Sequence, residues 1–282
     1  MTMPTAHRPT GPTTPSHARM IDTGAVALHV TTYAGNGPAL LLVHGIGSSG
    51  AGWDPVIDDL AAEFSPITFD LRGHGASDKP EHGYLYPEYV ADIEGLIAAL
   101  GLERPLVIGH SLGGILTLWW AARHPAQATA LVIEDSPLRS GEDFRPAFDG
   151  WLKLNALSLP ELRHYYASEY PEWPAAMVEA RARDMADTRR AVFAELREDS
   201  LANHGNDRIA EIEHISSPVL LIHGDVETGG MVHPEDIAEF PQRLPNASTI
   251  RIPGGGHTLH RSAKDAFLAA ALPFLRKNAG RG

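Results

Sequence analysis

The sequence predicts an α/β fold with a doubly wound, mostly parallel sheet and an inserted helical lid. Strand-like and helix-like segments alternate along most of the 282 residues, which is typical of a parallel sheet covered on both faces. The alternation stops at about residue 137 and resumes near 214, with charged, aromatic and helical patterns between. A G-x-S-x-G motif at residues 109–113 lies where an apolar run gives way to a helical pattern.

The elements follow one another in a regular order. An alternating segment, 26–33, is expected in an early antiparallel pair, and short apolar runs predict the central strands. The strands are expected at 26–33, 39–43, 65–70, 105–108, 130–134, 218–223 and 248–252, and the helices at 55–63, 88–100, 115–123 and 262–275. We expect a disordered tail over 1–20, a core formed by 21–136 and 214–282, and a lid over 137–213.

Composition excludes several classes of protein. A net charge of −12 without a long basic run argues against a nucleic-acid partner. The chain has no cysteine, so it has no disulfide, thiolate nucleophile or cysteine-bound metal, as is usual in a reducing cytoplasm. No segment reaches the ~20 apolar residues of a transmembrane helix, and the first residues lack the apolar stretch of a signal peptide. We therefore expect a cytoplasmic protein, and the oligomeric state is open.

Ser111 is the candidate nucleophile. A serine on so tight a strand-to-helix turn takes a strained backbone conformation that exposes its Oγ above the sheet. The positions two before and two after it lack bulk, since both are glycine. Most chance matches to the five residues do no chemistry, so the strand before and the helix after carry the prediction.

His257 is the candidate base for a serine nucleophile. It follows a Pro-Gly-Gly-Gly run after the last predicted strand and precedes the last helix. Loops at the carboxyl ends of parallel strands gather on one rim, so this loop and the serine turn can meet. His260 lies three residues on, and we expect it to cap or pack the helix.

Three carboxylates compete for the role of orienting His257. Glu227 is preferred, because it lies three residues after a turn glycine that follows a strand, and the chain order serine, acid, histidine is kept. Asp225 is closer to the turn and suits an Asx-type bond. Asp135 ends another strand on the same rim and stays an alternative.

Two backbone N–H groups are expected to bind the oxyanion of an acyl-transfer intermediate. Leu112 offers one from the first turn of the helix after Ser111. The second is assigned to Ile46, in the His-Gly-Ile-Gly loop of residues 44–47, whose glycines allow the amides to turn inward.

Other motifs receive structural or weaker assignments. The run from Asp70 to Ser77 lacks the lysine and spacing of a phosphate loop, so Asp70 and Arg72 are expected to hold turns near Ser111. His110, Trp53 and Trp151 are the candidate pocket residues. Further aromatics of the predicted lid serve packing more often than binding.

These motifs together resemble the α/β-hydrolase fold superfamily over nearly everything after residue 20. The resemblance is carried by residues 44–47, 70–77, 109–113, 224–227 and 256–257. It implies an eight-stranded sheet, a lid between the sixth and seventh strands, and a Ser-acid-His triad. One departure is glutamate at 227, where aspartate is usual, and some members take the acid from the end of strand six.

The predicted function is hydrolysis of a small or medium carboxylic ester or lactone through an acyl-enzyme. A serine at the turn excludes the branches that need a carboxylate nucleophile there. A carbon–carbon bond hydrolase, a perhydrolase and a low-turnover ligand-binding receptor of the same fold are the alternatives. The chemistry calls for no metal or other cofactor, and the expected partner is a small ester or lactone.

Overall fold

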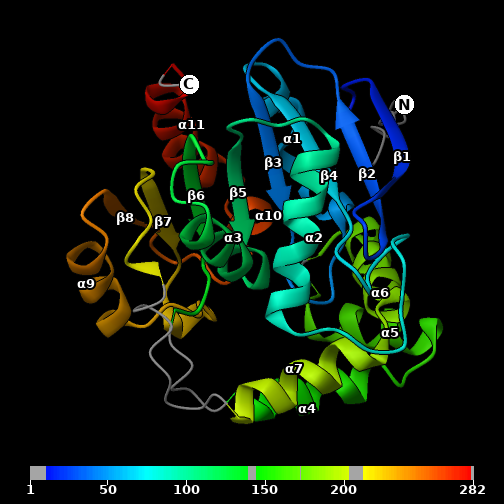
Figure 1. Cartoon of the computed structure of the whole chain (residues 1–282). Helices are drawn as coiled ribbons and strands as arrows, with labels where there is room; N and C mark the ends of the chain where they lie inside the picture. Colours follow the sequence, from blue (N-terminus) through cyan, green and yellow to red (C-terminus); the bar gives the residue numbers. More distant parts are fainter. Residues whose placement is uncertain (1–10, 139–143, 172, 203–211, 281–282) are drawn as a thin grey trace, which may run out of the picture.

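A single eight-stranded sheet forms the centre of the molecule (Figure 1). The computed structural model describes residues 11–138, 144–171, 173–202 and 212–280. The strand order is β1-β2-β4-β3-β5-β6-β7-β8, in which β2 is antiparallel to its neighbours and β3 to β8 are parallel. The strands are β1 (Ser16–Asp22), β2 (Ala27–Tyr33), β3 (Ala39–Val43), β4 (Ser65–Phe69), β5 (Leu106–His110), β6 (Ala130–Glu134), β7 (Val219–His223) and β8 (Ala247–Arg251). The predicted fold class, a doubly wound and mostly parallel sheet, is confirmed.

The first strand corrects the predicted boundary of the tail. Residues 16–20 pair with β2 as part of β1, so the prediction of a disordered tail is wrong for them. Polar residues and the lack of an apolar run concealed this strand, which lies at the sheet edge and is mostly exposed. Residues 1–10 lie outside the described residues.

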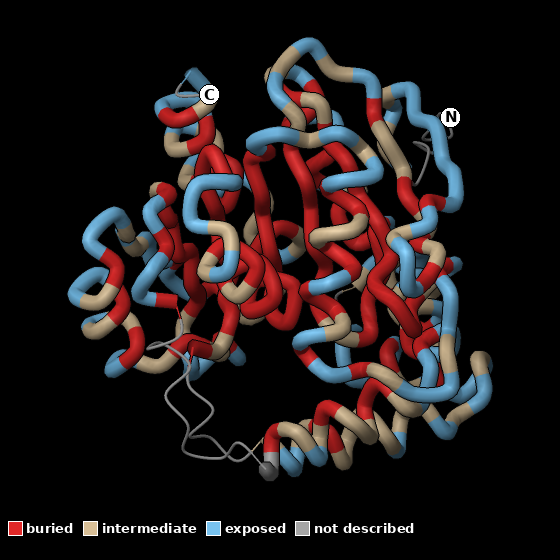
Figure 2. Tube along the Cα trace, in the orientation of Figure 1, coloured by how far each residue is buried: buried red, intermediate tan, exposed pale blue. Residues whose placement is uncertain are grey.

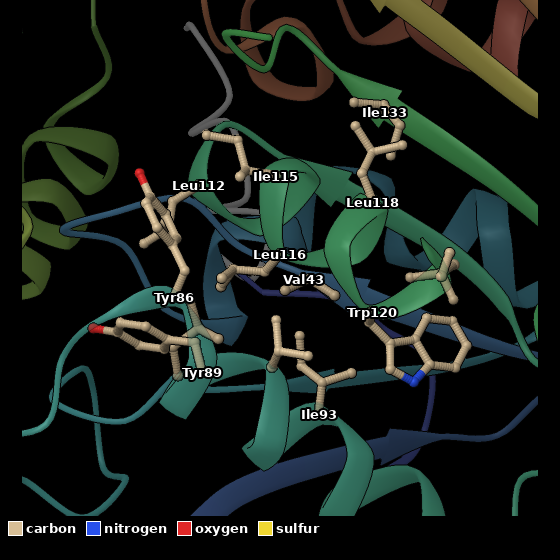
Figure 3. Close-up of a cluster of buried hydrophobic side chains, with 14 of the residues drawn as sticks. Val43, Tyr86, Tyr89, Ile93, Leu112, Ile115, Leu116, Leu118, Trp120 and Ile133 are labelled. Atoms are coloured by element: carbon tan, nitrogen blue, oxygen red, sulfur yellow. The ribbon is translucent and has the colours of Figure 1, made fainter. Parts of the chain in front are cut away.

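Helices cover both faces of the sheet. Helices α2 (Tyr86–Ala99) and α3 (Leu112–Arg123) pack on one face, and α1 (Asp54–Ala61) and α11 (Lys264–Ala279) on the other. Figure 3 shows α2 and α3 meeting through Tyr89, Ile93 and Leu116, with Val43 of β3 beneath them. Central strands β5, β6 and β7 are buried at every residue, and Figure 2 shows burial concentrated along the strands. Their continuous apolar sequences follow from burial on both faces.

The interruption between β6 and β7 is helical where it is described. It contains α4 (Arg145–Leu154), α5 (Leu159–Glu169), α6 (Ala175–Asp187) and α7 (Arg190–Ala202). These helices lie beyond the carboxyl ends of the central strands (Figure 1), and they have a core of their own. We call this helical group, residues 144–202, the lid. Parts of the predicted lid, residues 139–143 and 203–211, lie outside the described residues.

The remaining helical segments are short or follow the last strands. They are η1 (Gly50–Trp53), η2 (Val226–Thr228), α9 (Pro234–Arg243) and α10 (Leu259–Ser262). Sequence reasoning missed α9, which carries a proline within it. Among all described helices, none combines the length and hydropathy that crossing a membrane would require.

Candidate active site

Ser111 occupies a strained turn between β5 and α3. Its φ of 53° lies in the left-handed region, which costs a non-glycine residue of order 1–3 kcal/mol and persists only where the surroundings enforce it. The Ser111 N–H donates to the Glu134 carbonyl at 3.0 Å, and the Ser111 carbonyl accepts from the N–H groups of Gly114 and Ile115. The turn is therefore fixed from both sides, and Ser111 lines a pocket at this point.

The flanking glycines are required by close backbone packing. A Cβ on Gly109 would lie 2.5 Å from the Gly113 carbonyl oxygen, and one on Gly113 would lie 2.2 Å from the Val43 oxygen. Real Cβ atoms do not approach backbone so closely. The sequence prediction that both positions must lack bulk agrees with this geometry.

His257 is held by Asp135. Its Nδ1 lies 2.7 Å from Asp135 Oδ2, and Asp135 is fully buried at the end of β6. The carboxylate also accepts the N–H groups of Met231 at 2.8 Å and Gly224 at 3.2 Å. Asp135 has a φ of 41°, so it too is held in an unfavourable backbone conformation. The two backbone N–H groups hold the Asp135 carboxylate in place, and the carboxylate in turn orients the His257 imidazole.

The preferred acid, Glu227, is wrong as a contact of His257. The chain after Gly224 turns into the η2 segment, which leaves Glu227 exposed, while Asp135 fills the position against His257 Nδ1. Asp225 is also elsewhere, because it pairs with Arg251 at 2.5 Å and accepts the Gly254 N–H at 2.8 Å. It thereby supports the loop that leads to His257. The alternative that the sequence left open, Asp135, makes the contact.

His110 fastens the His257 loop to the serine turn. Its Nε2 lies 2.9 Å from the His257 carbonyl oxygen, so this nitrogen carries the proton and donates. The two rings lie 4.6 Å apart, centre to centre. Burial holds the pKa of His110 well below its usual value, so the ring is neutral. His110 is thus a buried support, and it is not among the residues that line the pocket beside Ser111.

The loop of residues 44–49, hereafter the oxyanion loop, lies directly against Ser111. A Cβ on Gly45 would lie 3.0 Å from the Ser111 Cβ. The Gly45 carbonyl accepts from His44 Nδ1 at 2.7 Å and from the Ser48 N–H at 3.3 Å. A trans peptide directs its C=O and N–H in opposite directions, so these bonds also fix the Ile46 N–H. Within the described residues, neither this N–H nor that of Leu112 has an acceptor.

Two buried neutral histidines support the oxyanion loop. His44 Nε2 accepts the Leu71 N–H at 2.9 Å, and His74 Nε2 accepts the Gly47 N–H at 3.1 Å. Burial lowers the pKa of His44 to about 4 and that of His74 to about 3. Each ring keeps its Nδ1 proton and leaves Nε2 as an acceptor, which protonation would abolish.

A pocket opens over Ser111 between the core and the lid. Its walls are apolar apart from two serines and the tyrosine hydroxyl, and Trp151 is among them as predicted. The lining residues are Ile46, Tyr86, Ser111, Leu112, Ile115, Pro137, Phe144, Phe148, Trp151, Leu196, Ser200 and Met231. Trp53 is not among them. It is fully buried and packs against the His260 ring at 4.2 Å between centres, so its assignment to the pocket is wrong.

A second carboxylate-imidazole pair lies beneath the site, and sequence reasoning missed it. Glu134 is fully buried, and its oxygens lie 2.7 and 2.9 Å from His260 Nδ1. The His260 N–H donates to the same carboxylate at 2.9 Å. The sequence expectation that His260 packs was sound, but its partner is long-range. The available signal was a glutamate at the end of an otherwise apolar strand.

The segment from Asp70 to Ser77, which follows β4, has the structural role expected of it. Asp70 accepts the N–H groups of Gly50 at 2.7 Å and Ala76 at 2.8 Å. Arg72 pairs with the buried Asp92 of α2 at 2.5 Å. Among the side chains in the described ranges, no group of three or more His, Asp or Glu is arranged to hold a metal ion.

The chain is similar in sequence to a known protein family over most of its length. The sequence model of the alpha/beta hydrolase family matches residues 40–270. The chain belongs to the alpha/beta hydrolase family. This confirms the resemblance that the motifs carried.

Relatives of this hydrolase chain include enzymes with different substrates. A 2-(acetamidomethylene)succinate hydrolase of Mesorhizobium japonicum is 27% identical over 278 residues, which covers 92% of this chain and 95% of the relative. An N-formylmaleamate deformylase of Pseudomonas putida is 27% identical over 263 residues, covering 90% and 95%. By name, the first relative is a hydrolase and the second a deformylase.

Solved structures agree on the fold. The crystal structure of E-2-(acetamidomethylene)succinate hydrolase has a TM-score of 0.77 at 28% identity, covering 93% of this chain and all of that one. An enol-lactonase from Burkholderia xenovorans LB400 has a TM-score of 0.75 at 22% identity and likewise shares the fold, covering 92% and 100%.

Proposed function

We propose that this hydrolase cleaves a neutral carboxylic ester or lactone through an acyl-enzyme formed on Ser111. The observation that carries the proposal is that the strained Ser111 lies at one pocket with the N–H groups of Ile46 and Leu112, which have no acceptor among the described residues. A serine hydroxyl, a histidine oriented by a carboxylate and paired amide donors are the parts that acyl transfer needs.

In the proposed reaction, His257 removes the Ser111 proton as Oγ attacks the substrate carbonyl carbon. The negative charge that develops on the carbonyl oxygen is stabilised by the Ile46 and Leu112 N–H groups. Asp135, through Nδ1, keeps the second nitrogen of His257 available as base and stabilises the imidazolium. His257 then protonates the leaving oxygen, and a water molecule that it activates releases the acid from Ser111.

The pocket lining supports a neutral substrate. Aromatic and aliphatic side chains such as Phe148, Trp151 and Leu196 surround the space over Ser111, and the described lining has no lysine, arginine or histidine. A carboxylate placed there would lose its hydration without gaining a cationic partner, which is costly. An alkyl or aryl group would gain free energy from burial.

A second candidate is favoured by the relatives. The names 2-(acetamidomethylene)succinate and N-formylmaleamate denote nitrogen-containing carboxylate substrates. A hydrolase acting on such a compound would use the same Ser111, His257 and Asp135, and would differ in what fills the pocket.

A substrate screen distinguishes the two candidates. The purified chain and Ser111→Ala are assayed on p-nitrophenyl esters of graded acyl length, on γ- and δ-lactones, and on 2-(acetamidomethylene)succinate and N-formylmaleamate. We expect kcat/KM to be highest for neutral esters or lactones and to vanish in Ser111→Ala. Preference for the two nitrogen-containing carboxylates supports the second candidate, and activity retained by Ser111→Ala contradicts both.

A further inference from the structure

The oxyanion loop forms hydrogen bonds with both the lid and the core. The Gly47 carbonyl accepts from Arg181 Nη1 at 2.5 Å, and the Gly47 N–H donates to His74 Nε2 on the opposite side. Gly47 has a φ of 63°, a left-handed conformation that glycine adopts without strain. The residue directly after Ile46 is therefore fixed through both of its peptide groups.

Helix α6 supplies a second contact to the same loop. Asp184, one helical turn after Arg181, faces the Ser49 side chain, which favours the charged form of the carboxyl. Arg181 Nη1 lies 3.7 Å from Asp184 Oδ2, and its guanidinium lies 5.6 Å from the centre of the Tyr166 ring. Both side chains are largely buried. Their geometry is fixed within the lid, so they hold the loop at a set position.

A residue of the core binds Ser48, which lies between Gly47 and Ser49 in the oxyanion loop. Arg261 Nη2 lies 3.0 Å from Ser48 Oγ, and its Nε donates to the Gly52 carbonyl at 3.0 Å. Arg261 follows His257 by four residues and lies in α10. Gly47 and Ser48 are thus each bound by an arginine, Arg181 from the lid and Arg261 from the core.

Apolar packing joins the same two parts. Ile46 packs against the lid core. A Cβ on Gly47 would lie 3.5 Å from the Phe193 ring and 3.6 Å from Met185. The lid therefore rests on the oxyanion loop, and it does not merely roof the pocket.

We propose that Arg181 is a positioning residue for the oxyanion hole, so that seating of lid helix α6 sets the direction of the Ile46 N–H. This inference rests on the proposed acyl chemistry. A donor misplaced by a fraction of an ångström stabilises the developing oxyanion poorly and still permits ground-state binding. The lid then contributes to kcat as well as to substrate capture.

The test uses Arg181→Gln and Arg181→Lys, with Arg183→Gln as matched control. Arg183 lies on the same helix, is mostly exposed and pairs with Glu179, away from the loop. We expect Arg181→Gln to lose about tenfold to a hundredfold in kcat on a neutral ester with KM changed less than about threefold. Arg181→Lys should recover part of the loss, and Arg183→Gln should match the parent.

A second readout is independent of the natural substrate. A fluorophosphonate forms an adduct on Ser111 whose oxygen occupies the oxyanion hole, and its labelling rate is followed by mass spectrometry. Arg181→Gln should label about tenfold or more slowly than Arg183→Gln, while urea unfolding shows both folded. Equal labelling and equal kcat overturn the positioning role of Arg181. A parent chain that is not labelled instead overturns the proposed function.

Discussion

At the scale of single residues, the site depends on a carboxylate that ends a strand. Asp135 is buried, receives two backbone N–H groups, and lies 2.7 Å from His257 Nδ1. Glu227 has the more usual place in the sequence, yet the η2 turn leaves it exposed. The order of residues along the chain does not distinguish Asp135 from Glu227, because both lie between Ser111 and His257.

This assignment predicts unequal effects of two amide substitutions. Asp135→Asn should lower kcat/KM by about 10³–10⁴-fold, because the amide favours the wrong imidazole tautomer and leaves the imidazolium unstabilised. Glu227→Gln should leave kcat/KM within about twofold. Steady-state kinetics on one neutral ester measures both, and a larger loss for Glu227→Gln would refute the assignment.

His74 gives the molecule a defined pH dependence of stability. Its folded pKa is lowered to about 3 by burial and by the nearby His44, whereas an unfolded histidine titrates near its ordinary value of 6.5. Asp70 and Lys79 also face the ring electrostatically. Above the unfolded pKa, both states are neutral and the contribution of His74 is complete. As pH falls below it, only the unfolded state binds the proton, so this contribution decreases.

We therefore expect His74→Asn to be less stable than the parent at pH 7.5, with a gap that narrows on acidification. The narrowing should approach about 1.4 kcal/mol per pH unit between pH 6 and 5. Urea unfolding at several pH values measures it, with His82→Asn, at a largely exposed histidine, as control. A gap that stays constant or widens as pH falls would show that His74 is not held neutral.

At the scale of elements, the turn between β5 and α3 requires glycine because the start of α3 packs closely against β3. Helix α3 crosses so close to β3 that a Cβ on Gly113 would lie 2.2 Å from the Val43 oxygen. Helix α4 contains Gly150, where a Cβ would meet nothing within 4 Å. Both are helical, so intrinsic propensity favours alanine equally at each.

The same substitution should thus have opposite effects in the two helices. Gly113→Ala should destabilise by several kcal/mol or prevent soluble expression, because the helix must move off the sheet. Gly150→Ala should stabilise by up to about 1 kcal/mol. Urea unfolding gives both values, and similar stabilities for the two variants would mean that α3 does not pack on β3 as described.

At the scale of the whole molecule, local sequence patterns predicted most strands of the sheet and did not predict the contacts between residues far apart in the sequence. Apolar runs placed β3, β5, β6 and β7, since strands buried on both faces read as continuous hydrophobic sequence. The edge strand β1 was missed because exposed strands carry no such run. The pairing of Glu134 with His260, 126 residues apart, has no local signature at all.

In the candidate active site too, the sequence predicted the locally determined residue and not the long-range contacts. Ser111 was predicted from its own turn together with the strand-like run before it and the helical pattern after it, which are all local features of the sequence. The carboxylate contact of His257 depends on how β6 and the loop after β8 end beside each other, which spacing does not determine. The support of the oxyanion loop by Arg181 depends on how the lid packs, which the sequence pattern leaves open.

The most direct test of the central claim is to trap the acyl-enzyme. The parent chain is mixed with p-nitrophenyl butyrate, quenched in acid within the first turnovers and digested for mass spectrometry. We expect a butyryl group on the peptide containing Ser111, and neither adduct nor turnover in Ser111→Ala. Turnover of the ester with Ser111 unmodified in the parent, or undiminished turnover in Ser111→Ala, would contradict it.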